Sequence, residues 1–147
     1  MTGEIGMAEK KRVLVLCTGN SCRSQMAEGL INHLLGDRWE AYSAGTMPSR
    51  VNPYAMRSME EIDIDITDHQ AKSADVYRDR QFDWVITLCA EADQNCPVFP
   101  GAANRAYIDF EDPANVIGSD AEIMAQFRRV REDMRQRLLD FLRAHSA

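Results

Sequence analysis

Apolar positions recur with two different periods along the chain. After Arg12, a short run of valine and leucine over residues 12–16 is typical of a buried strand. Over residues 24–35 the apolar positions instead recur four residues apart, which predicts a helix that ends at Gly36. The same reasoning predicts three more strands and one more helix, at residues 39–43, 83–88 and 105–108 and at residues 52–62.

The last part of the chain carries the clearest helical pattern, over residues 121–144. One face of this predicted helix is apolar and consists of Ile123, Phe127, Val130, Met134, Leu138 and Phe141. Ser119 and Glu122 have the spacing of a capping box, which marks the start of the helix. The opposite, arginine-rich face is interpreted as a solvated surface.

The order of these elements indicates the fold. Strands and helices alternate with short connections, and this order is typical of a parallel sheet that is covered on both sides. We therefore expect an α/β protein: a flavodoxin-like single domain with a four-stranded parallel sheet and helices on both faces. Ligands bind such sheets at the carboxyl ends of the strands, so functional residues are expected just after positions 16, 43, 88 and 108.

Length and composition agree with one globular domain. The chain has 147 residues, of which 45% are hydrophobic and 27% charged, close to the average of globular proteins. We expect residues 1–11 to form a disordered or loosely ordered extension and residues 12–147 to form the single catalytic domain. The N-terminus lacks the basic start and apolar stretch of a signal peptide, so a cytoplasmic location is expected.

Charge and cysteine content narrow the possible functions. Seventeen Lys and Arg against 23 Asp and Glu give a net charge of −6, which argues against binding to nucleic acid or to an anionic membrane. In a reducing compartment, cysteines are more often reactive or metal-bound than structural. The four are Cys17, Cys22, Cys89 and Cys96. Their spacings, with four and six intervening residues, fit zinc ligation poorly, so no metal site is expected from them.

The turn between the first strand and the first helix has the character of an anion cradle. Small and polar residues let its backbone N–H groups point inward, and the following helix presents its positive end. Arg23 adds a fork of donors for a tetrahedral oxyanion, and the same donors stabilise a Cys17 thiolate. The predicted oxyanion-binding residues are Thr18, Gly19, Asn20, Ser21, Cys22, Arg23 and Ser24. The alternative, a buried packing cysteine beside an ordinary surface arginine, does not account for strand, turn, arginine and helix together.

Seven short motifs occur in order from residue 17 to residue 114. They are Cys-Thr-Gly-Asn-Ser-Cys-Arg-Ser-Gln-Met-Ala-Glu-Gly (17–29), Tyr-Ser-Ala-Gly (42–45), Val-Asn-Pro (51–53), Ile-Asp-Ile (62–64), Thr-Leu-Cys (87–89), Asn-Cys-Pro (95–97) and Asp-Pro-Ala (112–114). In these motifs the chain resembles the low-molecular-weight protein tyrosine phosphatase superfamily, and more narrowly its thioredoxin-coupled arsenate reductases.

The resemblance implies a role for five residues. Cys17 would be the nucleophile, Arg23 the oxyanion clamp and Asp112 the acid that protonates the departing oxygen. A carboxyl just after the fourth strand, stiffened by Pro113, suits that role. In the reductases' scheme, Cys17 attacks arsenate, Cys89 attacks the adduct and expels arsenite, and Cys96 then attacks Cys89. The resulting Cys89–Cys96 disulfide would be reduced by thioredoxin.

The spacing of Cys89 and Cys96 sets a geometric condition on that scheme. If residues 90–95 were helical, the two Cα atoms would lie about 10.5 Å apart, beyond the roughly 7 Å limit for a disulfide. The segment must therefore rearrange to oxidise, and we expect it to be locally unstable.

Two other functions remain open at this point. A phosphatase would need only Cys17, Arg23 and Asp112, but the tyrosines that follow Asp-Pro in the phosphatases are replaced by Ala114 and Asn115. This replacement favours a small inorganic oxyanion such as arsenate. A non-catalytic oxyanion or redox sensor is the third possibility, and the presence of Asp112 argues against it.

The remaining expectations concern cofactors and assembly. Related reductases carry a monovalent-cation site, whose matches here are Asn20, Glu28 and Ser43, but Lys72 stands where a further acidic residue is expected. The ammonium group of Lys72 could supply the positive charge in place of a potassium ion. For Asn20 and Ser43 we prefer the interpretation that they form hydrogen bonds that hold the loop in place. No tightly bound cofactor is expected. Cys22 is interpreted as a packing or redox-backup residue, and the protein as a monomer.

Overall fold

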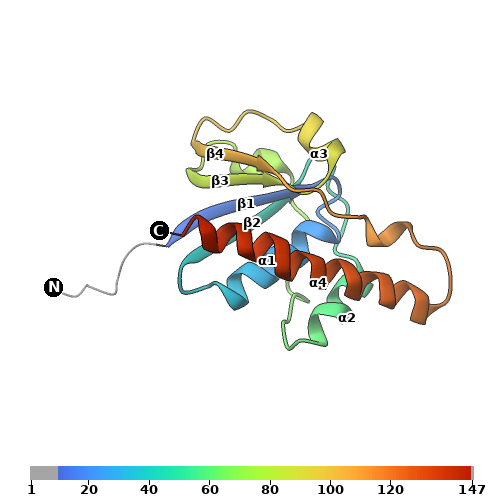
Figure 1. The fold of residues 1–147 in the computed structure, drawn as a ribbon. Coiled ribbons are helices and arrows are strands. Elements are labelled where there is room, and N and C mark those ends of the chain that lie inside the picture. The colour runs from blue at the N-terminus through green and yellow to red at the C-terminus, as the bar shows by residue number, and fades with distance from the viewer. Residues whose placement is uncertain (1–9, 147) are drawn as a thin grey trace.

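Four parallel strands form one sheet in a computed structural model that describes residues 10–146. Along the sheet the order is β2 (Trp39–Gly45), β1 (Lys11–Cys17), β3 (Phe82–Thr87) and β4 (Ala102–Tyr107) (Figure 1). All three neighbouring pairs are parallel. The expected α/β fold with a four-stranded parallel sheet is confirmed. Of the predicted extension over residues 1–11, residues 1–9 lie outside the described part, and β1 already begins at Lys11.

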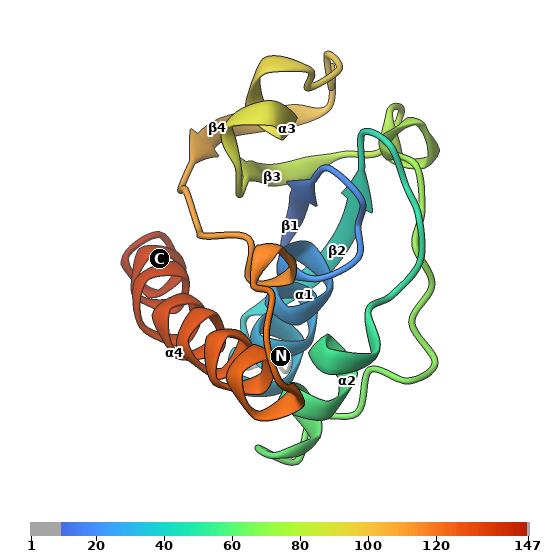
Figure 2. The same cartoon turned by 90° about the vertical axis from the view of Figure 1, so that its right-hand side faces the viewer.

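The three longer helices cover one face of the sheet, as Figure 2 shows. They are α1 (Arg23–Leu34), α2 (Pro53–Glu60) and α4 (Asp120–Ala144). Val13 and Val15 of β1 point into this layer, whereas Leu14 and Leu16 point to the other side. A strand that is buried on both faces needs apolar side chains at successive positions, which explains the continuous apolar run over residues 13–16.

The second face is covered by short helical turns and connecting segments instead of long helices. The 3₁₀ turn η1 (Ala74–Tyr77) lies here, and Tyr77 packs edge-on against Phe82 with ring centroids 6.0 Å apart. Phe99, from the segment before β4, is buried in the same cluster. The smaller helix α3 (Ala90–Gln94) follows β3 at the carboxyl end of the sheet. A further 3₁₀ turn, η2 (Pro113–Asn115), follows β4.

The predicted boundaries agree with the structure except at the sheet edge. The capping box of Ser119 and Glu122 is present at the start of α4, as predicted. Strand β4 begins at Ala102, three residues before the predicted start at Arg105. β4 is an edge strand whose residues 103–105 are exposed, so no apolar pattern marks its beginning.

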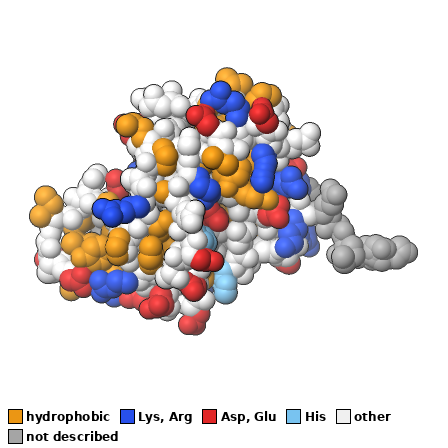
Figure 3. Space-filling model, turned by 180° about the vertical axis from the view of Figure 1, so that it is seen from behind, with side chains coloured by type: hydrophobic (Ala, Val, Ile, Leu, Met, Phe, Trp, Pro, Cys, Tyr) orange, Lys and Arg blue, Asp and Glu red, His pale blue; other side chains and the backbone are white. Residues whose placement is uncertain are grey.

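The surface carries both signs of charge. Acidic and basic side chains are interspersed on the face shown in Figure 3. Within residues 10–146, no helix combines the length and the apolar character needed to cross a membrane. The carboxyl ends of all four strands meet at one edge of the sheet, where the predicted functional residues gather.

Candidate active site

The loop between β1 and α1 turns its carbonyl groups away from the pocket. The carbonyls of residues 17, 18, 19 and 21 accept hydrogen bonds of 2.8–3.3 Å from backbone N–H groups of residues 46, 47, 49 and 52. Because a trans peptide unit directs its C=O and N–H groups oppositely, the N–H groups of residues 18, 19, 20 and 22 face inward. The loop therefore has the inward donors of an anion cradle.

Close contact between this loop and β2 depends on Gly45. A Cβ atom at this position would lie 2.5 Å from the Thr18 carbonyl oxygen and 2.8 Å from the Asn20 amide nitrogen. Asn20 itself has a φ of 50°, a left-handed conformation that asparagine tolerates better than most residues. Gly45 and Asn20 thus allow the tight curl that the sequence predicted.

Cys17 lies at the bottom of the cradle and is only 2% exposed. Its Sγ atom is 2.9 Å from Ser24 Oγ. Ser24 Oγ already accepts a hydrogen bond of 2.7 Å from Asn20 Nδ2, so its own proton is free to be donated to the sulfur. Donation from Ser24 to the sulfur of Cys17 is the direction that a nucleophilic thiolate requires.

Asn20 connects the cradle to its surroundings. Its Oδ1 atom accepts from Gln25 Nε2 at 3.0 Å and from the backbone N–H of Lys72 at 2.8 Å, while its Nδ2 atom also donates to Ser43 Oγ at 3.0 Å. Ser43 in turn donates to a carboxylate oxygen of Glu28. The three residues expected at a cation site do lie together, but Asn20 Oδ1 is already taken by two N–H donors. Lys72 reaches Asn20 with its backbone, and its ammonium group donates to the Gln70 carbonyl instead.

Arg23 and Asp112 lie side by side at the pocket. An Nη atom of Arg23 is 3.7 Å from Asp112 Oδ2, and the other donates to the Phe110 carbonyl at 3.1 Å. Asp112 Oδ1 accepts the Ala114 N–H and thereby caps η2, which fixes the carboxyl group at the rim. The pocket between loop, α3 and η2 has a volume of about 270 Å³ and is lined by Cys17, Cys22, Arg23, Glu91 and Asp112, among others.

The four cysteines are free and have different surroundings. Cys89 is 6% exposed, directly precedes α3, and forms one buried cluster with Cys17 and Ala92. Cys96 follows α3 and packs against the cluster on the second face of the sheet. Burial raises the pKa of the Cys96 thiol. Cys17 and Cys89 are thus brought together, and Cys96 is held apart from both.

Cys22 is buried within the loop, and this burial raises the pKa of its thiol to about 12. Its Sγ atom lies 3.8 Å from Ser21 Oγ. A thiol with such a pKa stays protonated at neutral pH, which agrees with its interpretation as a packing residue.

One side chain at this site, Glu91, is not marked by any pattern in the sequence. Glu91, in the first turn of α3, accepts a hydrogen bond of 2.8 Å from the Thr18 hydroxyl. The same hydroxyl is 3.5 Å from Cys89 Sγ. Glu91 stands two residues after a candidate cysteine, but its spacing to Thr18 along the chain gives no sign of the contact.

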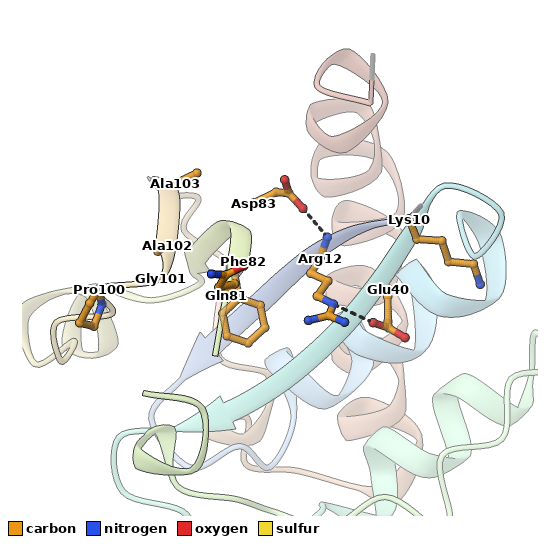
Figure 4. Close-up of a pocket in the computed structure, with 10 residues that line it drawn as sticks. All are labelled: Lys10, Arg12, Glu40, Gln81, Phe82, Asp83, Pro100, Gly101, Ala102 and Ala103. Atoms are coloured by element: carbon orange, nitrogen blue, oxygen red, sulfur yellow. Dashed lines mark hydrogen bonds and ion pairs between the residues drawn. The ribbon is translucent and has the colours of Figure 1, made fainter. Parts of the chain in front are cut away.

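A larger cavity of about 850 Å³ lies at the other end of the sheet, near the amino ends of β1 and β3 (Figure 4). Two of its charged side chains, Arg12 and Glu40, pair with each other at 3.2 Å, and Asp83 accepts a hydrogen bond of 2.8 Å from the backbone N–H of Arg12. It contains none of the predicted site residues. Among residues 10–146, no group of three or more His, Cys, Asp or Glu side chains is arranged to hold a metal ion.

The chain is similar to proteins named as arsenate reductases, both in sequence and in structure. The arsenate reductase of Halalkalibacterium halodurans is 46% identical over 132 residues, which are 90% of this chain and 95% of the relative. A solved arsenate reductase in the phosphate-binding state has a TM-score of 0.75 at 30% identity and covers 93% of this chain and 99% of its own. A thioredoxin-dependent arsenate reductase of Corynebacterium glutamicum has a TM-score of 0.59 at 30% identity, covering 90% of this chain and 64% of its own.

The family assignment rests on a match over almost the whole described chain. Residues 12–146 match the family described as low molecular weight phosphotyrosine protein phosphatase. The match includes the cradle, the cysteine pair and the Asp-Pro turn. This chain therefore belongs to the low molecular weight phosphotyrosine protein phosphatase family.

Proposed function

We propose that the protein is an arsenate reductase in which Cys17, Cys89 and Cys96 act in turn. The observation that carries this proposal is the shared cluster of Cys17 and Cys89 beside an oxyanion cradle. A phosphatase needs one cysteine at this place, whereas reduction of arsenic needs a second thiol close to the first. The naming of the relatives as arsenate reductases supports the same conclusion.

The first step uses the cradle. Cys17 Sγ attacks the arsenic of arsenate, whose oxygens are held by the loop N–H groups and by Arg23. Asp112 donates a proton to the oxygen that departs as water. The product is a covalent adduct with a bond between Cys17 Sγ and arsenic.

In the next two steps a disulfide forms first between Cys17 and Cys89 and then between Cys89 and Cys96. The Cys89 thiolate attacks Cys17 Sγ and forms a disulfide, while the electron pair of the sulfur–arsenic bond passes to arsenic, which leaves as arsenite. Cys96 then attacks Cys89 Sγ and frees Cys17 for another cycle. Because Cys96 packs on the other face of the sheet, α3 has to unwind before the Cys89–Cys96 disulfide can form.

The reductant that we propose is thioredoxin. Val98 and Tyr107, near the Cys96 segment, are 75% and 45% exposed, and exposed apolar side chains suit contact with a protein. The thioredoxin dependence of the Corynebacterium glutamicum relative supports this choice. Glutaredoxin in place of thioredoxin is the comparison that the assay should include.

Phosphotyrosine hydrolysis is the second candidate, because Cys17, Arg23 and Asp112 would serve it equally well. Ala114 and Asn115 offer no aromatic ring on which a phosphotyrosine could stack. We expect at most slow hydrolysis of aryl phosphates.

We also propose that no resident cofactor takes part and that Asn20, Glu28 and Ser43 brace the loop. The two N–H donors on Asn20 Oδ1 support bracing over potassium binding. Equal turnover in potassium and tetramethylammonium buffers is the expected result. Four free thiols suit a cytoplasmic, reducing location, and we propose a monomer that size-exclusion chromatography can test.

A coupled assay tests the function as a whole. The protein is mixed with arsenate, thioredoxin, thioredoxin reductase and NADPH, and NADPH oxidation is compared for wild type, Cys89→Ser and Cys96→Ser. Both substitutions should stop multiple turnover, but Cys96→Ser should still release one arsenite per protein molecule. Turnover that survives both substitutions would refute the relay, and phosphotyrosine hydrolysis without arsenate turnover would establish the phosphatase.

A further inference from the structure

The Thr18 hydroxyl lies between a thiol and a carboxylate. Thr18 Oγ1 is 3.5 Å from Cys89 Sγ and 2.8 Å from Glu91 Oε1. Cys89 is buried, whereas Glu91 is exposed to solvent at the mouth of the pocket. The three groups form a line from the buried sulfur to the surface.

The direction of these hydrogen bonds follows from the number of protons. A threonine hydroxyl has one proton, and the ionised carboxylate of Glu91 can only accept it. The contact with Cys89 must then use a lone pair of Thr18 Oγ1, so the Cys89 S–H is the donor. In this arrangement a protonated Cys89 donates its S–H to the Thr18 hydroxyl, which donates to Glu91.

We propose that Glu91 takes up the proton of Cys89 through Thr18 when Cys89 attacks the Cys17 adduct. The S–H bond of Cys89 breaks as its proton passes to Thr18 Oγ1, and the Thr18 proton passes to Glu91 Oε1. Cys89 is left as a thiolate, Thr18 as a hydroxyl and Glu91 as a neutral acid that returns its proton to solvent. The inference rests on the proposed reductase function, and Glu91 is a positioning residue because it acts through Thr18.

Other charged groups face this line from each neighbouring element. The loop contributes Cys17, Arg23 lies across the pocket with Asp112, and α3 itself carries Asp93. The Tyr107 hydroxyl of β4 donates to Asp109 and so is directed away from Cys89. Asp112 lies 3.7 Å from Arg23, which leaves Glu91 as the carboxylate hydrogen-bonded to the neighbour of Cys89.

A purely structural role for Glu91 is the competing explanation. An acidic residue in the first turn stabilises a helix, and Glu91 would do so without any proton transfer. Asp93 provides the matched comparison, because it belongs to the same turn of α3 and accepts a hydrogen bond of 2.8 Å from another threonine, Thr87. The Thr87 hydroxyl otherwise contacts the Ala106 carbonyl instead of a thiol. Loss of either carboxylate weakens the attachment of α3. Of the two carboxylates, Glu91 is the one whose threonine partner, Thr18, also contacts Cys89.

The test is the rate of a single turnover in the Cys96→Ser background, where the reaction stops at the Cys17–Cys89 disulfide. Glu91→Gln should slow arsenite release at pH 7 about tenfold, because an unassisted thiol is only a few per cent ionised there. The loss should shrink below about threefold at pH 9, where an unassisted thiol is mostly ionised. Asp93→Asn should change the rate less than about twofold at either pH. Thr18→Val should match Glu91→Gln, and Thr18→Ser should restore most of the rate.

A second measurement separates this inference from the proposed function. In a Cys17→Ser, Cys96→Ser background, the alkylation of Cys89 by iodoacetamide is followed by mass spectrometry, with and without Glu91→Gln. Slower alkylation at pH 7 but not at pH 9 supports the proton path, even if arsenate is never reduced. An equal effect of Glu91→Gln and Asp93→Asn, or a loss that does not depend on pH, would overturn it. Absence of arsenite release from the parent Cys96→Ser protein would instead refute the reductase.

Discussion

The two cysteine-bearing segments of the pocket are built in opposite ways. The loop of Cys17 is held by many hydrogen bonds: its carbonyls accept from backbone N–H groups of the segment after β2, and Asn20 makes contacts to Ser24, Ser43, Gln25 and Lys72. The segment of Cys89 and Cys96 contains only five helical residues, of which Ala92 alone is buried. Two side-chain bonds to threonines, at Glu91 and Asp93, attach it to the rest of the fold.

This difference matches what each segment has to do. Binding and attack on an oxyanion require donors that are held in place before the substrate arrives. Transfer of a disulfide from the pocket to the surface requires a segment that unfolds locally at small cost.

The rigid loop should be indispensable to chemistry. Cys17→Ser should lower arsenate reduction by at least about 1000-fold, because loss of a nucleophile removes the covalent route altogether. The protein should remain folded, because serine fits the space of cysteine and Ser24 can still donate to it. The coupled NADPH assay measures the loss, and circular dichroism checks the fold. Retention of more than a tenth of the activity would show that another thiol starts the reaction.

The redox segment should change conformation while the loop does not. Oxidation to the Cys89–Cys96 disulfide should shift the amide resonances of residues 90–97, because a helical segment would hold the two Cα atoms about 10.5 Å apart, beyond the roughly 7 Å limit for a disulfide. Resonances of residues 18–24 should move little. A ¹⁵N-labelled sample, compared before and after oxidation, provides the measurement. Identical spectra over residues 90–97 would contradict the contrast between the segments.

Removal of one asparagine in each segment should have unequal effects on stability. Asn20→Ala strips hydrogen bonds from several buried groups and should lower the free energy of unfolding by about 3 kcal/mol. Asn95→Ala removes an exposed bond from its Nδ2 to the Glu91 carbonyl and should cost less than about 0.5 kcal/mol. Urea unfolding of both variants measures the difference. Equal costs would mean that the loop is not the more strongly anchored segment.

The contact between the end of α2 and α4 should contribute a small, pH-dependent part of stability. Arg128 and Arg131 of α4 hydrogen-bond to Glu61 and lower its pKa to about 2, from an ordinary value near 4.5. A lowered pKa means that the contribution is present above about pH 4.5 and is lost as the pH falls toward 2. Since Glu61 is about a third exposed, Glu61→Gln should cost about 1 kcal/mol at pH 7.

The check on this prediction is a series of urea denaturations between pH 2 and pH 7. The curves of wild type and Glu61→Gln should converge as the pH falls below 4.5. A constant difference over the whole range would show that Glu61 stabilises the fold by packing instead of by charge.

Features that depend on neighbours in the sequence were predictable, and features that depend on distant neighbours were not. The turn after β1 and the capping box of Ser119 could be predicted because each is a local pattern of residue types. The early start of β4 was missed because exposed residues at a sheet edge carry no apolar period. The place of Lys72 in the sequence leaves open a substitute for the charge of potassium, whereas the structure shows its backbone N–H donating to Asn20 and its ammonium group to the Gln70 carbonyl.

The missed contact at the site has the same origin. Thr18 and Glu91 are 73 residues apart, and their hydrogen bond exists only because β1 and β3 are adjacent in the sheet. The prediction of a sheet placed residues 17 and 89 at one edge, but not the direction of each side chain. Side-chain directions at strand ends therefore had to come from the structure.

The relay of three thiols is tested most directly by one arsenate equivalent added to the fully reduced protein without thioredoxin. After an acid quench and alkylation, peptide mass spectrometry identifies which cysteines are bonded. The relay predicts one arsenite per protein molecule, a Cys89–Cys96 disulfide, and alkylated Cys17 and Cys22. Arsenite release with Cys89 and Cys96 both still alkylated would contradict it.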